Sequence, residues 1–462
     1  MKKCTAGYLV AGKIWRGALL AVIVLLALSC ATKSDAYTRV DEAVSQHNFE
    51  AAIEVIRDAQ EGKKPLYSEK NSILLYLDKG FLEHYAGNYQ ISSDDLQNAE
   101  RMIEEAFTKS VTEDIASYIA NDNTKEYPGE DFEDIYINVF NALNYYKSGN
   151  TEGALVEVRK LTIPSGKLNM LAMKYEGAGK TAGDWMMQQL GKIGFTLSAA
   201  LPQGEPVNFS NSALARYLSA LFYLADRNTD GARIEFDQLQ EAFNSNPTIY
   251  SHPVPSTVAQ ERSVPAGQAR LNVIGFVGLS PIKEEGLFTQ TWPFFQYRDL
   301  QSPIFKLPIM VDRPSVIDGI EITIKDEKFR LELLEDMGAV IKETFTARFN
   351  NMFFKTYIRV LLKYAAAEIT ARVAVDQGAP QLAAMAGIFA AKKGLDATEG
   401  ADIRMSRYLP NKALVGGINV EPGTYDISIS YLSGERVVSS ETIDGVEVKA
   451  GALNLVDVIN LK

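Results

Sequence analysis

A short polar turn that recurs four times is the feature that most constrains the fold of this chain. It occurs at 47–52 (HNFEAA), 86–89 (AGNY), 147–154 (KSGNTEGA) and 226–232 (DRNTDGA). Apolar residues spaced i, i+3 and i+4 lie on both sides of these turns, which is the spacing of one helix face. The chain from 37 to 246 is therefore predicted to form helical hairpins joined by tight turns.

The residues of the turn support this prediction. Glycine readily adopts the left-handed conformation that ends a helix, and asparagine or threonine caps the next helix. In these features the segment resembles the tetratricopeptide repeat, whose period is about 34 residues. Ala52 and Ala154 lie 102 residues apart, three such periods, but Ala154 and Ala232 lie 78 apart, and an irregular insertion runs from Pro164 to Phe209. We expect degenerate tetratricopeptide-like repeats; a generic helical bundle is the alternative.

The second half of the chain changes character. Residues 247–267 are rich in proline and read as a linker. Beyond it, residues 268–462 are predicted to form an α+β domain, with strands in 269–325, helices in 328–395 and strands again in 415–462. The predicted fold class is thus α+β and multidomain: an all-α N-terminal half, then a β-rich, sandwich-like domain with an inserted helical segment.

The N-terminus predicts export. Residues 1–29 have a basic start and then an uncharged apolar run of 13 residues from Gly17 to Ser29. Such a run is shorter than the roughly 20 residues of a membrane-spanning helix and is typical of a signal peptide. The Leu28-Ser29-Cys30 ending resembles a lipobox, although Ala27 stands where leucine is usual. We expect Cys30 to be lipidated, followed by a tether to residue 36. An ordinary secretory signal or an uncleaved anchor are the alternatives.

The charge and cysteine content of the chain limit the kinds of partner and metal site that it can have. Removal of 1–29 would take away four basic residues and change the formal net charge from −11 to −15. An acidic chain offers no electrostatic footprint for nucleic acid, so we expect none as a partner. Cys4 leaves with the signal, and Cys30 alone can form neither an internal disulfide nor a cysteine-based zinc site. Since Ala31 follows the cysteine, we expect an anchor in the outer membrane, facing the periplasm.

Residues suited to catalysis are few. Only His47, His84 and His252 could act as imidazole bases, and they lie in two turns and the linker. Gly177-Ala178-Gly179-Lys180-Thr181 ends like a phosphate-binding loop, but Lys174 stands where its first glycine should be. The acids Glu130, Asp131, Glu133 and Asp134 read as a solvated, capped helix start. We therefore predict a protein that is not an enzyme and uses neither cofactor nor metal.

Aromatic residues in the helical half suggest a partner-binding groove. The candidates are Tyr136, Phe140, Tyr145, Tyr146, Tyr217, Phe222 and Tyr223. The alternative is that most of them form the core between repeats. An aromatic stretch at Trp292–Tyr297 could form an exposed strip that binds glycan, or could pack a sheet against the inserted helices. The alanine-rich run at 382–392 is too short to span a membrane.

Two stretches resemble a known family. One is the Tyr127-Pro-Gly-Glu-Asp-Phe-Glu-Asp-Ile-Tyr136 block and the helix after it; the other joins Ala401-Asp-Ile-Arg404 to Val420-Glu-Pro-Gly-Thr-Tyr425. Both resemble an uncharacterised family of bacterial envelope lipoproteins with a tetratricopeptide-like N-terminal half. Its members are often encoded beside lipoproteins similar to penicillin-binding-protein activators or to the curli secretion lipoprotein. Related sequences commonly read Ala-Asp-Thr-Arg-Ser-Trp where this chain reads Ala-Asp-Ile-Arg-Met-Ser. The resemblance supplies no catalytic motif.

Together these features predict an interaction protein. The expected role is a lipid-tethered periplasmic scaffold that binds other envelope proteins, in peptidoglycan synthesis or secretion as the family's neighbours imply. The alternative is an envelope lipoprotein that binds a small ligand or a glycan.

Overall fold

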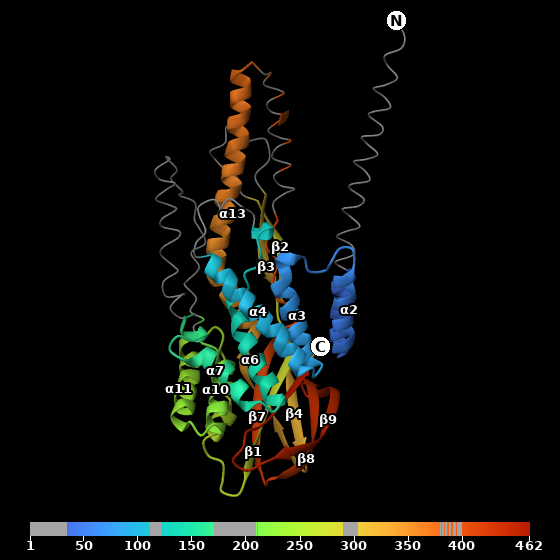
Figure 1. The fold of residues 1–462 in the computed structure, drawn as a ribbon, viewed down its shortest axis with the longest axis vertical. Coiled ribbons are helices and arrows are strands. Elements are labelled where there is room, and N and C mark those ends of the chain that lie inside the picture. Colours follow the sequence, from blue (N-terminus) through green and yellow to red (C-terminus); the bar gives the residue numbers. More distant parts are fainter. Residues whose placement is uncertain are drawn as a thin grey trace.

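The computed structural model describes residues 35–110, 122–170, 209, 211–289, 304–378 and 400–462, with isolated positions from 380 to 394. Cys30, Gly177–Thr181, Trp292–Tyr297 and most of 382–392 lie outside the described residues. The chain is mixed α and β, with helices in its N-terminal half and sheets in its C-terminal half, as predicted (Figure 1).

The helical half contains residues 35–45 and the labelled helices that follow. These are α2 (Phe49–Glu61), α3 (Ser72–Tyr85), α4 (Tyr89–Ser110), α6 (Asp131–Lys147), α7 (Thr151–Thr162), α10 (Ala213–Ala225), α11 (Thr229–Ser245) and α12 (Ser256–Gln260), with short 3-10 turns at Glu69–Asn71 and Asp122–Thr124.

All four predicted turns have one shared geometry. Each turn contains a residue with positive φ directly before its asparagine. In chain order these residues are His47, Gly87, Gly149 and Arg227. The asparagine that follows donates its backbone N–H to the carbonyl five residues earlier, as Asn150 does to Tyr145 at 2.8 Å. At three of the turns the asparagine side chain also caps the next helix, as Asn150 does at Gly153. The predicted helical hairpins are confirmed.

The C-terminal half contains three sheets and one long helix. Its strands are β1 (Ala269–Leu279), β2 (Ile282–Thr289), β3 (Ile304–Val311), β4 (Gly319–Ile324), β5 (Glu327–Arg330), β6 (Glu332–Asp336), β7 (Pro410–Val420), β8 (Gly423–Ser433), β9 (Arg436–Val448) and β10 (Asn454–Asn460), and the helix is α13 (Met337–Asp376). The strand orders are β10-β1-β7-β6 and β5-β4-β8-β9, and β2 pairs with β3 alone. All described pairings are antiparallel except β1 with β10.

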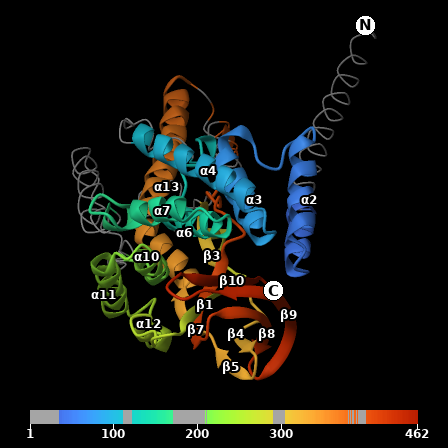
Figure 2. The ribbon, with the colours of Figure 1, turned by 60° about the horizontal axis from the view of Figure 1, so that its bottom comes forward.

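The β10-β1-β7-β6 sheet is the middle layer of the molecule (Figure 2). Ile274 and Phe276 of β1 belong to a core shared with the helices, whereas Leu271 and Val273 face a second core with β4 and β8. Residues of β1 are therefore buried on both faces, which explains their nearly continuous apolar sequence.

Two predicted boundaries are wrong. Residues 327–336 form β5 and β6 rather than the start of the inserted helix, because β6 pairs with β7 and β5 with β4. Residues 247–267 are not an open linker. They include α12, and Ile249, Tyr250 and Val258 are buried in the core that the helices share with the middle sheet. The two halves are consequently joined by a continuous hydrophobic interior.

Candidate functional site

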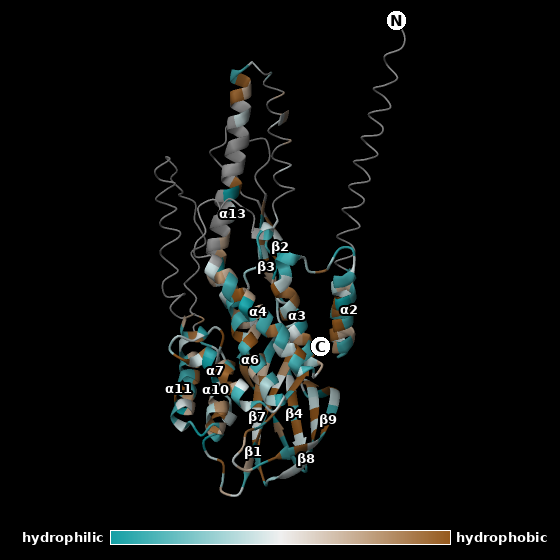
Figure 3. Cartoon of the chain, in the orientation of Figure 1, coloured by the Kyte–Doolittle hydropathy of each residue, from teal (hydrophilic) through white to brown (hydrophobic). Residues whose placement is uncertain are grey.

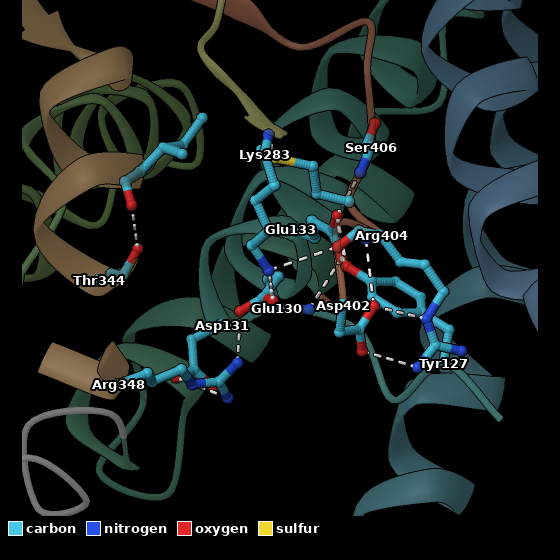
Figure 4. Close-up of polar contacts among 12 residues, drawn as sticks. Tyr127, Glu130, Asp131, Glu133, Lys283, Thr344, Arg348, Asp402, Arg404 and Ser406 are labelled. Atoms are coloured by element: carbon cyan, nitrogen blue, oxygen red, sulfur yellow. Dashed lines mark hydrogen bonds and ion pairs between the residues drawn. The ribbon is translucent and has the colours of Figure 1, made fainter. Parts of the chain in front are cut away.

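A group of charged residues lies at the start of α6, where several distant segments meet (Figure 4). Glu130 precedes α6, and its carboxylate binds two cations on different elements. Its Oε1 pairs with Lys283 of β2, and its Oε2 pairs with Arg348 of α13. Asp131 lies 3.2 Å from the same guanidinium. One carboxylate therefore connects the helical half to both the β2–β3 ribbon and the long helix.

Glu133, one turn further along α6, is completely buried. Its carboxylate accepts hydrogen bonds from the Tyr127 hydroxyl at 2.8 Å, the Glu130 backbone N–H at 2.8 Å and the Ser406 backbone N–H at 2.6 Å. Burial raises the pKa of Glu133 to about 7, with a further contribution from the negative charge of Glu130. The capping function predicted for this acidic group is confirmed by the reciprocal contacts of Glu130 and Glu133, but the predicted solvation is wrong for Glu133.

Burial also tends to raise the pKa of Glu130, yet the pKa of this carboxyl group is lowered overall. The positive charges of Lys283 and Arg348 outweigh the cost of desolvation. Two carboxylates one helical turn apart thus have pKa values displaced in opposite directions. This is the electrostatic arrangement of an acid–base pair, but Glu133 has no exposed surface at which a substrate could meet it.

The two stretches that carry the family resemblance contact each other here. Residues 401–408 pass across the helical half: the Ser406 hydroxyl donates to Asp78 Oδ1 at 2.8 Å, and the Tyr85 hydroxyl donates to the Tyr408 carbonyl at 2.8 Å. Arg404 pairs with Asp402 at 2.8 Å and lies over the ring of Tyr127, 5.4 Å from its centroid. The Ala-Asp-Ile-Arg motif and the Tyr-Pro-Gly-Glu-Asp motif are therefore two sides of one interface.

A second cluster surrounds Glu335 of β6, which is completely buried. It accepts hydrogen bonds from the hydroxyls of Tyr136 at 2.8 Å, Tyr250 at 2.7 Å and Ser212 at 2.9 Å, and from the Leu214 N–H at 3.2 Å. Burial raises the pKa of Glu335, while these donors act against the rise. The cluster fastens the middle sheet to α6 and α10.

A third cluster lies at the other end of α6. His84 is buried, with Nδ1 2.6 Å from Asn144 Oδ1 and Nε2 3.1 Å from Asp457 Oδ2. Lys147 lies 2.6 Å from the other oxygen of Asp457. Burial alone would raise the pKa of Asp457, but Lys147 and His84 lower it. The three histidines do not converge, since His47 is exposed in a turn and His252 lies near Tyr250.

The seven aromatic residues predicted to line a groove are placed differently. Tyr136, Phe140, Tyr217 and Phe222 are completely buried, Tyr223 is 8% exposed, and Tyr145 and Tyr146 are partly buried. The groove prediction is wrong for the buried side chains, because they lie in the core that the helices share with the middle sheet. Phe140 packs against Phe276 of β1, with ring centroids 5.0 Å apart.

The tyrosine hydroxyl groups of these seven residues form hydrogen bonds within the protein. Tyr146 donates to the Leu453 carbonyl and accepts from the Leu455 N–H, and Tyr217 donates to Glu261. Tyr145 accepts from Gln97, and the Tyr223 hydroxyl lies 3.0 Å from the hydroxyl of Thr162. These residues join helices to one another and to the sheet.

Among the residues of these clusters that sequence analysis missed, Asp457 carried the clearest signal. Asp457 is the single acid of β10 and lies between Val456 and Val458, whereas Glu335 is one of three acids in β6, Glu332-Leu333-Leu334-Glu335-Asp336. An acid on a buried strand face needs a partner, so such positions could have been singled out. Lys283 and Arg348 carried no comparable signal.

In the described parts of the chain, no group of three or more His, Cys, Asp or Glu side chains is arranged to hold a metal ion. No helix there is both long and apolar enough to cross a membrane. Comparisons of the chain with protein-family models, with curated proteins and with solved structures found no match.

Proposed function

We propose that this protein is a non-enzymatic adaptor of the bacterial envelope, anchored by a lipid on Cys30 and presenting α13 to other envelope proteins. The proposed location is the outer membrane, facing the periplasm, and the proposed processes are peptidoglycan synthesis or secretion. In this proposal the helical half is a set of degenerate tetratricopeptide-like repeats and the C-terminal half is sandwich-like.

The observation that carries the proposal is the reach of α13. It has 40 residues, about 60 Å at roughly 1.5 Å per residue, and extends well beyond the helices beside it (Figure 1). Its start is buried in the body through Met337, Val340 and Ile341. At its far end Val373 is 47% and Val375 38% exposed, and Figure 3 shows hydrophobic residues there. Exposed apolar residues on a projecting helix favour contact with another macromolecule.

The attachment of α13 suits such a role. Arg348 holds it to Glu130 and Asp131, and Asp336, just before it, caps it by accepting from the Ala339 N–H at 2.8 Å. A helix fixed at its base presents a surface in a defined direction, which lowers the entropy lost on binding.

The test is site-specific photocrosslinking in cells of the source organism. A photoreactive amino acid at Val373 is compared with one at Val437 of β9, a valine that is 54% exposed on the body. The proposal expects a discrete crosslinked envelope protein from position 373 that is absent from position 437. The Val373→Asp and Val375→Asp double variant, probed from a neighbouring position, should lose the same product. Crosslinks of equal identity and yield from both positions would contradict it.

The alternative, a glycan- or ligand-binding lipoprotein, predicts a different result. Under it position 373 would give no protein crosslink, and purified protein would be retained on peptidoglycan or another envelope glycan.

A further inference from the structure

A pocket of about 200 Å³ lies away from the charged clusters, where the end of α10 meets the start of β1 and the segment before β10. Its apolar walls come from both halves of the chain: Leu221, Leu224, Val264, Ala269, Ala452 and Leu453. Four polar residues also line it: the partly buried Gln268, and Glu261, Arg270 and Asn272, which are each at least nine-tenths buried.

The side chains of Glu261 and Arg270 pair with each other and form hydrogen bonds with neighbouring residues of the protein. Arg270 Nε lies 2.9 Å from Glu261 Oε1, and its Nη2 donates to Thr257 Oγ1 at 2.5 Å. The Tyr217 hydroxyl donates to Glu261 at 2.9 Å. These contacts neutralise the two charges and hold the polar wall in place. A neutral group is therefore accommodated here more readily than an ion, whose burial would need its own counter-charge.

Asn272 differs from both. It is 3% exposed, and its Oδ1 is buried without a hydrogen-bond partner in the described parts of the chain. Gly417, its register partner on β7, leaves it room: a Cβ at that position would stand 2.9 Å from Asn272 Oδ1. A buried carboxamide oxygen without a donor is costly, and a ligand that supplies an N–H removes that cost.

We propose that this pocket binds a peptide segment, taking one aliphatic side chain together with its backbone amide. The apolar walls match an aliphatic side chain. A carboxamide offers one acceptor and a pair of donors, so it complements the N–H and C=O of a peptide unit. The neutral ion pair beside it disfavours a charged ligand. The site lies apart from α13 and does not depend on the adaptor role proposed above.

The first experiment uses N-acetyl-L-leucine N,N-dimethylamide, whose acetamido N–H is its only donor, as the probe and the full chain without residues 1–29 as the protein. Saturation-transfer NMR should detect binding with a Kd of about 1 mM, the range that so small a ligand can reach. The matched probe replaces the acetamido N–H with an ester oxygen. It should bind roughly fivefold more weakly, because it cannot donate to Asn272.

Two variants locate the site. Ala452 is exposed at the mouth of the pocket, so Ala452→Trp should close it without disturbing the core and abolish probe binding. Asn272→Leu should bind the amide and ester probes equally. Val437→Trp, on the exposed surface of β9, is the control and should bind as the unaltered protein does.

Three results would overturn the proposal. One is no saturation transfer at about 10 mM probe, tenfold above the expected Kd, which would mean that the pocket holds solvent only. Another is unchanged binding in Ala452→Trp, which would place the probe elsewhere. The third is equal binding of the amide and ester probes by the unaltered protein. None of them bears on crosslinking from Val373.

Discussion

The imidazole of His84 lies 3.1 Å from the carboxylate of Asp457, although 373 residues separate the two in the chain. His84 is in the last turn of α3, and Asp457 is in the middle of β10. Both side chains are buried, and Lys147 of α6 completes the group. This contact, the Glu335 cluster and the Glu130–Glu133 cluster are three polar attachments between the helices and the C-terminal half.

Asp457→Asn tests the first attachment. The substitution leaves Lys147, whose side chain is 21% exposed, without its buried counter-ion. Removing one member of a buried ion pair costs about 3–5 kcal/mol, and we expect a loss of free energy of unfolding near the lower end. Urea denaturation measures it. Asp444→Asn on exposed β9 is the control and should change stability by less than about 0.5 kcal/mol. Equal effects of the two substitutions would contradict the attachment.

Tyr136→Phe tests whether Tyr136, which the sequence placed in a binding groove, stabilises the core instead. The phenylalanine keeps the packing but removes one of the donors to Glu335. Hydrogen bonds to charged groups contribute about 1.5–3 kcal/mol, so unfolding free energy should fall by that order. Tyr76→Phe is the matched control, because Tyr76 is partly buried and has no hydrogen bond to any described residue. A stable Tyr136→Phe variant that had lost a partner would restore the groove hypothesis.

The raised pKa of Glu133 predicts a pH dependence with a defined sign. Its pKa rises from 4.5 in the unfolded chain to about 7 in the folded protein. Between these values the folded state binds more protons, so stability falls as pH rises and levels off above about 7. Across this window the contribution of Glu133 should amount to about 2–3 kcal/mol.

Glu133→Gln isolates this effect. The variant cannot titrate at this position, so the decline in unfolding free energy between pH 5 and pH 7 should be shallower than in the unaltered protein by about that amount. Denaturant titrations at the two pH values measure the difference. Parallel pH profiles in the two proteins would show that Glu133 does not carry the proton.

Glu130→Gln should loosen the base of α13. It removes the carboxylate that pairs with Lys283, which is 5% exposed, and with Arg348, which keeps its ion pair with Asp131. We expect hydrogen exchange to accelerate roughly tenfold or more at residues 337–349 and in β2, since about 1.4 kcal/mol of local stability corresponds to a factor of ten. Exchange in β8 and β9 should not change. Glu327→Gln, on exposed β5, is the control. Uniform acceleration across the chain would indicate global destabilisation instead.

Cys30→Ser tests the anchor. Loss of the thiol removes the only lipidation site expected in the mature chain, so incorporation of labelled palmitate should disappear. The protein should then leave the membrane fraction. A matched Ser34→Ala variant should retain both label and membrane association. Retention of Cys30→Ser in membranes with the signal uncleaved would favour the alternative of an uncleaved anchor.

Local sequence determined the turns and the alternating strands. Gly87 and Gly149 permit positive φ, and the asparagines after them bond to backbone within five residues, so these turns depend on short-range interactions alone. The strand Tyr425–Tyr431 could be predicted for a similar reason, since its alternation of buried and exposed residues is a property of an extended backbone.

Tertiary structure decided what the sequence left open. Residues 332–336 belong to a stretch with the apolar spacing of a helix. They form β6 instead, because they pair with β7. Tyr136 and Phe140 are aromatic residues of the kind that line binding grooves. Their side chains are buried because β1 and β6, more than 130 residues later in the chain, lie against α6. Backbone preferences act over a few residues, whereas burial and the pairing of charges depend on segments that only the complete fold brings together.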